Sequence, residues 1–300
     1  MKRLMIVYNP RSSQFERVRD EVLNKVRELK GWMVGKYEVR DTDVDDNARR
    51  LAKVLNDGDL VVAAGGDGTA TIAVNGIMLS GAEGVKFGVL GYGNFNDMAR
   101  TFRTRSLAEI MDGKCRKVWP LEAVVDGEHY RYGVCYFTLG MFAEATELFD
   151  DGVHRKKLKT GRKSIIFSWK ILARWYFKNK KRTFIPNFRL NGREMPKDVT
   201  DYVAVNGKSM ARVMRGGRWC FGERVFLSET GRLGRFWRLV ALMGRSVLAR
   251  VPGKESEGDV LEFARPADVE IQAEGEYKKL EGVRKIEVRK SKKCLGVMTR

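Results

Sequence analysis

A glycine-rich segment with one carboxylate at its centre is the strongest chemical feature of the sequence. An apolar run at 60–64 is followed by Gly65, Gly66, Asp67, Gly68 and Thr69. Glycines let a backbone approach a phosphate closely, and the amides at the start of a following helix face the anion. Thr69 can cap that helix. Asp67 would repel such a ligand unless it held Mg²⁺ or handled a proton. The segment is neither a Walker A loop nor a Rossmann fingerprint, and the alternative is an ordinary strand-to-helix turn.

A second pair of carboxylates lies near the end of the chain. Glu274 and Glu276 flank Gly275 in a short acidic turn that could face a cleft. A positioned carboxylate can accept the proton of a reacting hydroxyl. The alternative is an exposed charged hairpin, since Lys278 and Lys279 follow closely.

The predicted helices and strands that must position these groups follow two different patterns along the chain. In the first third of the chain, apolar runs alternate with helical patterns, which predicts a parallel sheet with helices on both faces. The strands are expected at 3–8, 33–39, 59–64 and 85–90, and the helices at 15–29, 45–55, 70–79 and 97–102.

After about residue 117 the rhythm changes to short strands with Gly and Asn turns, which predicts an antiparallel sandwich. Strands are expected at 118–126, 130–139, 188–190, 202–205, 225–228, 260–264, 269–273 and 284–289. The predicted fold class is therefore α/β plus β. Residues 1–119 form the glycine-loop domain, and 120–300 form the β-sandwich domain, whose last strands could return to the first.

Composition and charge limit the cellular compartment and the kinds of binding partner that the sequence predicts. The formal net charge is +19, and residues 155–182 contain twelve Lys or Arg and no acidic residue. Such a block indicates an anionic partner, either nucleic acid or an anionic membrane surface, or else a solvated basic face. Four scattered cysteines and two histidines indicate neither a zinc site nor a disulfide framework, which fits a reducing cytoplasm. No apolar stretch reaches the length needed to span a bilayer.

Two amphipathic helices are expected within the second domain, at 163–177 and 232–248. Trp169 and Trp175 line the apolar face of the first helix, with basic residues on another face. That pattern favours a helix lying on anionic lipid. The second helix is expected to cover the sandwich core.

Several segments together resemble the diacylglycerol kinase catalytic family, which includes bacterial lipid kinases and sphingosine kinases. The glycine segment matches its Gly-Gly-Asp-Gly-Thr signature, which NAD kinases share more distantly. The other segments that resemble it are 9–13 (Asn-Pro-x-Ser-Gly in the family), 74–77, 91–100 (similar to Pro-x-Gly-Thr-x-Asn-Asp-Phe-Ala-Arg) and 274–276 (Asp-Gly-Glu). The resemblance is closest over the first hundred residues.

The resemblance implies a kinase that uses ATP and Mg²⁺ to phosphorylate the hydroxyl of a membrane lipid. The nucleotide contacts carried over from the family, in addition to the glycine segment, are Asn9, Thr42 and Asn94. Glu276 matches the family's proton acceptor, and Glu274 replaces its usual Asp. The implied metal-binding residues are Asp97 and Glu223. The protein would be cytoplasmic and peripherally associated with an anionic membrane surface, and a homodimer stays open.

This sequence departs from the family pattern in places. Thr71-Ile72 stands where the family has Asn-Glu, Asn94 replaces a Thr, and the family's Asp-Gly-x-Leu-Asp segment is present only as residues 223–227. The alternatives are a soluble-substrate kinase of the NAD kinase type and a non-catalytic relative that binds lipid, nucleotide or nucleic acid. Nucleic acid is disfavoured because the aromatic-bearing strands of common RNA modules are missing.

Overall fold

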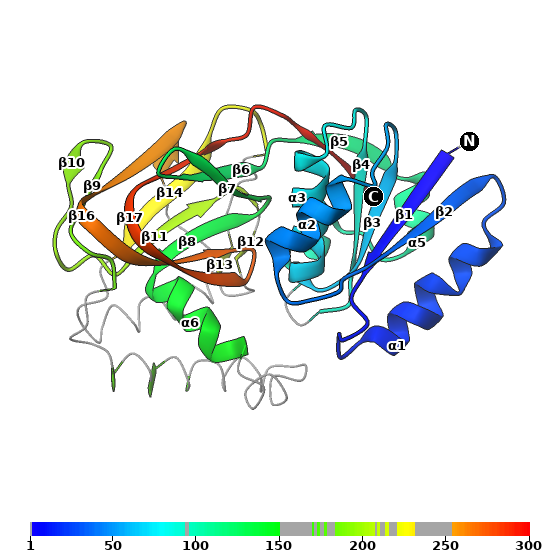
Figure 1. Cartoon of the computed structure of the whole chain (residues 1–300), viewed down its shortest axis with the longest axis horizontal. Coiled ribbons are helices and arrows are strands. Elements are labelled where there is room, and N and C mark those ends of the chain that lie inside the picture. The colour runs from blue at the N-terminus through cyan, green and yellow to red at the C-terminus, as the bar shows by residue number, and fades with distance from the viewer. Residues whose placement is uncertain are drawn as a thin grey trace.

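The chain folds into two sheets that lie side by side (Figure 1). The computed structural model describes residues 2–93, 96–150, 184–207, 221–231 and 254–300, with short stretches at 170, 173–174, 177–178, 209–210 and 214–215. A short pair of strands, β12 (Ser209–Met210) and β13 (Met214–Arg215), is separate from both sheets.

The first sheet has the order β2-β1-β3-β4-β18-β5 among the described residues. Neighbours from β2 to β18 run parallel, and β5 is antiparallel to β18. Its strands are β1 (Lys2–Tyr8), β2 (Trp32–Glu38), β3 (Leu60–Gly65), β4 (Lys86–Gly91), β5 (Lys114–Val118) and β18 (Leu295–Thr299). Every residue of β3 is buried, as expected for a parallel strand covered on both faces.

Helices cover the two faces of this sheet. One face packs against the irregular helix α1 (Phe15–Val18), η1 (Arg19–Leu23) and η2 (Lys25–Glu28), and against α5 (Leu107–Asp112). The other face packs against α2 (Val44–Ala52), α3 (Asp67–Leu79) and α4 (Asp97–Phe102). The Asp43 side chain begins α2 by accepting a hydrogen bond from Asp46 N at 2.9 Å.

The second sheet is antiparallel and is organised by one long hairpin. Its order is β15-β14-β11-β8-β16-β17-β6-β7, and β9 joins β16. The early half of β16 pairs with β9 and the late half with β8, with register shifts between Glu262 and Val269. The bend lets the two halves of the sheet share one core, so the sandwich is a single folded sheet.

The bounds of these elements are as follows: β6 (Leu121–Val125), β7 (Glu128–Gly133), β8 (Tyr136–Gly140), α6 (Met141–Asp150), β9 (Phe188–Leu190), β10 (Arg193–Glu194), β11 (Asp201–Val205), β14 (Phe226–Gly231), β15 (Lys254–Ser256), β16 (Gly258–Ala273) and β17 (Glu276–Lys290).

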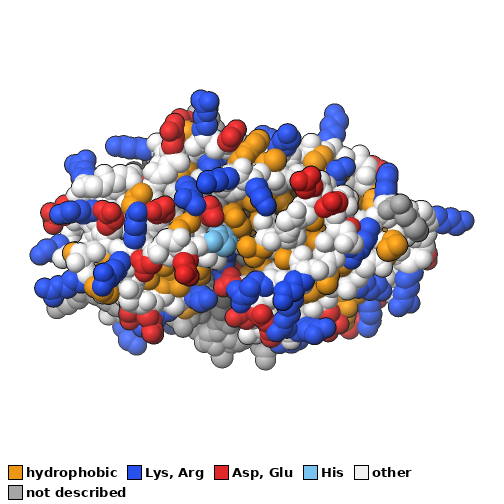
Figure 2. All heavy atoms as spheres, turned by 45° about the horizontal axis from the view of Figure 1, so that its top comes forward, with side chains coloured by type: hydrophobic (Ala, Val, Ile, Leu, Met, Phe, Trp, Pro, Cys, Tyr) orange, Lys and Arg blue, Asp and Glu red, His pale blue; other side chains and the backbone are white. Residues whose placement is uncertain are grey.

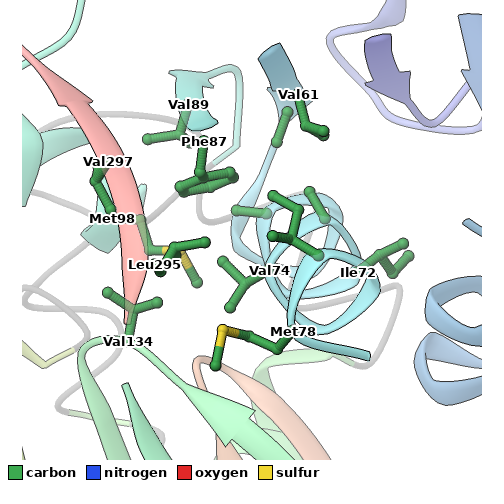
Figure 3. Close-up of a cluster of buried hydrophobic side chains, with 14 of the residues drawn as sticks. Val61, Ile72, Val74, Met78, Phe87, Val89, Met98, Val134, Leu295 and Val297 are labelled. Carbon is green, nitrogen blue, oxygen red and sulfur yellow. The ribbon is translucent and has the colours of Figure 1, made fainter. Parts of the chain in front are cut away.

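The two sheets share a hydrophobic cluster through α3. Val134 and Tyr136 from the second sheet join the cluster formed by α3, β3, β4 and β18 (Figure 3). Asn75 of α3 adds polar contacts, since its Oδ1 accepts from Tyr132 N at 2.8 Å and its Nδ2 donates to Tyr132 O at 3.0 Å. A helix buried on both sides explains why α3 is apolar nearly all round.

The structure confirms the predicted fold class, and it corrects several element boundaries. The expected strand at 118–126 is divided between β5 and β6, which belong to different sheets, because Pro120 interrupts it. The expected strand at 130–139 is β7 plus β8, and those at 260–264 and 269–273 are one strand, β16. β18 and α5 were not predicted. The expected helix at 232–248, most of that at 163–177, and most of the basic stretch 155–182 lie outside the described residues.

Candidate functional site

The parallel strands bring the residues that were predicted to bind a nucleotide to one edge of the first sheet. Tyr8 is level with Ala64, and Gly65 is level with Gly91, so β1, β3 and β4 end together. Asn9 follows β1, and its Oδ1 accepts a hydrogen bond from Arg11 N at 2.9 Å. Thr42 is exposed in the loop that leads to α2. Ligands of open α/β sheets bind outside such carboxyl ends.

The glycine loop leads directly into α3. Gly66 is the residue that precedes the helix, and no side chain caps it. The first amides of the helix are therefore open to an anionic ligand. The prediction that Thr69 caps this helix is wrong, because the helix begins earlier and Thr69 is its third residue. The Thr69 side chain packs on Gly65 instead, where an added Cβ would lie 2.5 Å from Thr69 Oγ1.

A second loop, between β4 and α4, lies against the glycine loop. Tyr92 N donates to Gly65 O at 2.8 Å. A Cβ on Gly93 would lie 2.5 Å from Gly66 Cα, so only glycine fits at this contact. The predicted nucleotide residue Asn94 belongs to this loop and lies outside the described residues.

Asp67 joins the two loops. Its carboxylate oxygens accept hydrogen bonds from Asn96 N and Asp97 N, both at 2.8 Å. Burial, followed by the nearby Asp97 carboxylate, raises the pKa of Asp67 to about 7, although the two amide bonds oppose this. Asp97 is 1% exposed and pairs with Arg100. Asp67 therefore fixes the β4–α4 loop, a role that its position in the sequence does not reveal.

The hairpin between β16 and β17 carries the two glutamates that were predicted to be catalytic. Glu274 and Gly275 have φ values of 53° and 89° and form a two-residue turn, with Ala273 opposite Glu276. The tip of this hairpin lies at the first domain, because Glu276 contacts the glycine loop. An added Cβ on Gly68 would overlap with Glu276 Oε1 and lie 3.2 Å from its Cδ.

Glu274 turns away from the glycine loop and into the second sheet. Its Oε1 accepts hydrogen bonds from Cys135 N and from Tyr136 N, the latter at 3.1 Å. The residue is 1% exposed, and its Oε2 has no hydrogen-bond partner among the described residues. Burial raises the pKa of Glu274 to about 8, so the carboxyl is largely protonated at neutral pH. The two glutamates of the hairpin therefore have different environments.

An ion-pair cluster beside Glu276 links the second sheet to α2, and the sequence did not predict it. The Arg131 side chain is 4% exposed and donates to Asp45 Oδ1 from Nε at 2.9 Å and from Nη2 at 2.7 Å. Lys278 Nζ lies 3.3 Å from Asp45 Oδ2, and the Tyr130 ring contacts both cations. The available signal was weak, because β7 also carries the exposed Glu128 and His129.

The two residues that the sequence predicted to bind metal differ in position and in exposure. Asp97 is at the glycine loop, whereas Glu223 is exposed in the segment before β14. Within the described ranges, no group of three or more His, Cys, Asp or Glu side chains could hold a metal ion. A Mg²⁺ ion that arrives with a nucleotide needs only one or two protein carboxylates, so the acidic residues present are compatible with one.

The structure places a carboxylate of the second sheet, Glu276, against the glycine loop at the carboxyl edge of the first sheet. Residues 3–127 of the chain match the model of the diacylglycerol kinase catalytic domain family. The glycine loop, the β4–α4 loop and α2 all lie within that range.

Comparison with curated proteins covers well under half of the chain. A diacylglycerol kinase from Staphylococcus epidermidis is 35% identical over 125 residues, which are 39% of this chain and 38% of that protein. A diacylglycerol kinase from Staphylococcus haemolyticus is 36% identical over 104 residues, or 34% of this chain and 30% of that protein. The matched part thus spans well under half the length of these relatives.

A solved structure has the same fold over the whole chain. The crystal structure of a diacylglycerol kinase from Bacillus anthracis superposes with a TM-score of 0.67, covering 100% of this chain and 97% of that one. The sequence identity is 12%, so this likeness concerns the fold alone.

Proposed function

We propose that the protein is an ATP- and Mg²⁺-dependent kinase that transfers the γ-phosphate to the hydroxyl of a membrane lipid, such as diacylglycerol or a sphingoid base. The match of residues 3–127 to the diacylglycerol kinase catalytic domain family and the names of the curated relatives support this. The observation that carries the proposal is the contact between Glu276 and Gly68, which puts a carboxylate at a phosphate-binding loop.

The nucleotide would lie at the carboxyl edge of the first sheet. The amides at the start of α3 would bind its phosphates, and Asn9, Thr42 and Asn94 would contact the rest of the nucleotide. Gly65, Gly66, Gly68 and Thr69 contribute shape, since larger residues would fill the space that the backbone leaves. The Mg²⁺ ion would be held by the phosphates together with Asp67 or Asp97, and it would neutralise their charge.

Glu276 is the group that we assign to the proton of the lipid hydroxyl. It is partly exposed beside the loop, so a hydroxyl could reach it. Glu274 is buried against the Cys135 and Tyr136 amides, and it is better suited to hold the hairpin tip in place. We therefore assign different roles to these two glutamates, both of which were predicted from the sequence to be catalytic.

A lipid substrate requires contact with a membrane surface. No helix among the described residues is long and apolar enough to cross a membrane. Lys and Arg side chains are spread over the face in Figure 2, with hydrophobic side chains gathered near its middle. The net charge of +19 supports peripheral binding to anionic lipid at the cytoplasmic side.

The test is transfer of label from ATP to a fractionated lipid extract, with NAD as a parallel acceptor. Wild type should label a lipid, Glu276→Gln should lower turnover by about 10²–10⁴-fold, and Glu274→Gln should keep most of it. Labelled NAD would instead support the soluble-substrate kinase. Equal labelling of lipid by wild type and Glu276→Gln, or none by either, would refute the assignment of the base or of the activity, respectively.

A further inference from the structure

A cavity of about 840 Å³ opens beside the end of β4, and Glu276 is not among the described residues that line it. Its wall is formed by the start of the α1 region, by α4 and the segment after it, and by the end of the chain. The charged residues that line it are Arg17, Glu21, Arg100, Arg103, Arg105 and Arg300. Five of these six carry positive charge.

The single acidic group of the cavity already has partners. Glu21 Oε1 lies 3.2 Å from Arg17 Nε, and Glu21 Oε2 accepts a hydrogen bond from Tyr92 OH at 3.0 Å. The Arg17 guanidinium also lies 5.5 Å from the centre of the Tyr92 ring. Glu21 therefore orients Arg17, and it leaves most of the positive charge in the cavity unbalanced.

Arg103 and Arg105 provide the unbalanced charge. Neither has an acidic side-chain partner among the described residues, and both side chains are exposed. Their backbone is held firmly, because Arg105 N donates to Glu109 Oε2 at 2.9 Å and Thr104 between them donates to Val89 O. The backbone therefore holds two guanidinium groups at the wall of the cavity, where both can reach one anion.

We propose that this cavity is a second anion site, separate from the glycine loop, and that it takes a phosphate monoester. Its volume is within the range of pockets that bind small molecules, so more than a phosphate group fits. Arginine forks match phosphate oxygens in pairs, and a phosphate monoester carries more negative charge than a carboxylate, which suits several guanidinium groups without acidic partners. The ester could be a soluble phosphorylated compound or the headgroup of a lipid, and the experiment separates these sources.

A ligand bound in the cavity would affect the glycine loop, because residues that line the cavity are linked to Asp67 by hydrogen bonds and an ion pair. Asn96 lines the cavity, and its backbone N donates to Asp67. Arg100 also lines it and pairs with Asp97, whose backbone N donates to Asp67 as well. A phosphate that draws Arg100 away from Asp97 would therefore alter the groups next to the nucleotide site.

The test measures binding of glycerol 3-phosphate by calorimetry, with and without saturating Mg-ATP, and of vesicles of phosphatidylcholine with and without phosphatidate by co-sedimentation. The variant is Arg103→Gln/Arg105→Gln. The matched control is Arg27→Gln/Lys30→Gln, which removes two exposed cations elsewhere on the same domain. Neither pair belongs to the proposed nucleotide site.

We expect the Arg103→Gln/Arg105→Gln protein to bind the monoester at least about tenfold more weakly, in the soluble or in the vesicle arm, while the control binds as wild type does. A soluble source gives the effect with glycerol 3-phosphate, and a lipid source gives it with phosphatidate vesicles alone. Equal loss in both double variants, no loss in either, or displacement of the monoester by ATP would overturn the second site. Binding of ATP by itself is measured separately, so failure of the nucleotide site and failure of this site are distinguishable.

Discussion

Replacing Glu274 by glutamine should make the protein less sensitive to alkaline pH. Glu274 is 1% exposed, and its pKa is raised from an ordinary 4.5 to about 8, with burial as the main cause. The folded protein therefore holds this proton at pH values where the unfolded chain has released it. Stability from this group is present in full below pH 4.5 and is lost as pH rises toward 8.

The size of the effect follows from the two pKa values. Linkage gives a loss of about 2.5 kcal/mol of unfolding free energy between pH 5 and pH 7, and about 4 kcal/mol between pH 5 and pH 9. Glutamine has no such proton. Its amide oxygen can still accept from the Cys135 and Tyr136 amides. The difference between variant and wild type should thus be small at pH 5 and grow with pH.

Urea denaturation at pH 5, 7 and 9, followed by fluorescence, measures this difference. Comparing variant with wild type cancels the contribution of Asp201, whose pKa is also raised and whose shift has other causes. Parallel pH profiles for the two proteins would show that the Glu274 carboxyl titrates normally when folded. In that case the reasoning would fail, whichever of the two proteins is the more stable.

Three further predictions concern contacts between the two domains and within the loops. Gly68→Ala should displace the Glu276 carboxylate and lower kcat by about tenfold or more, without loss of stability, because alanine favours a helix by about 0.5–1 kcal/mol. Gly93→Ala should weaken ATP binding by about tenfold or more in calorimetry, because its Cβ would lie 2.5 Å from the backbone of the glycine loop. Asp45→Ala should lower the unfolding free energy by about 3–5 kcal/mol in urea titration, because it leaves Arg131 buried without its partner.

Matched variants control for these changes. Gly222→Ala adds a Cβ with no heavy atom within 4 Å, so ATP binding should be unchanged. Asp268→Ala removes an exposed partner of Lys279, at 3.1 Å, and should leave stability unchanged within error. If Gly93→Ala binds ATP normally, or if Asp45→Ala unfolds like Asp268→Ala, the corresponding contact is not important.

Local patterns in the sequence were sufficient for most elements of the first hundred residues. The apolar strand at 60–64, the glycines after it and the helix up to Leu79 all depend on neighbouring residues, and the structure has them in that order. The predicted element boundaries were wrong where the composition of neighbouring residues indicated one continuous element. The run 118–126 has strand composition throughout, yet its two parts belong to different sheets. β18 was missed because a short strand that completes a distant sheet has no pattern of its own.

The sequence by itself determined the strand, the glycine turn and the helix that follows it, since residue types and short spacings specify these elements. Only the tertiary structure decided that Glu276 contacts Gly68, that Glu274 faces the second sheet, and that Asp67 binds the amides of another loop. The physical reason is that burial and long-range contacts set the direction of a side chain and its pKa. Two glutamates separated by one glycine look alike in the chain, and the fold gives them different surroundings.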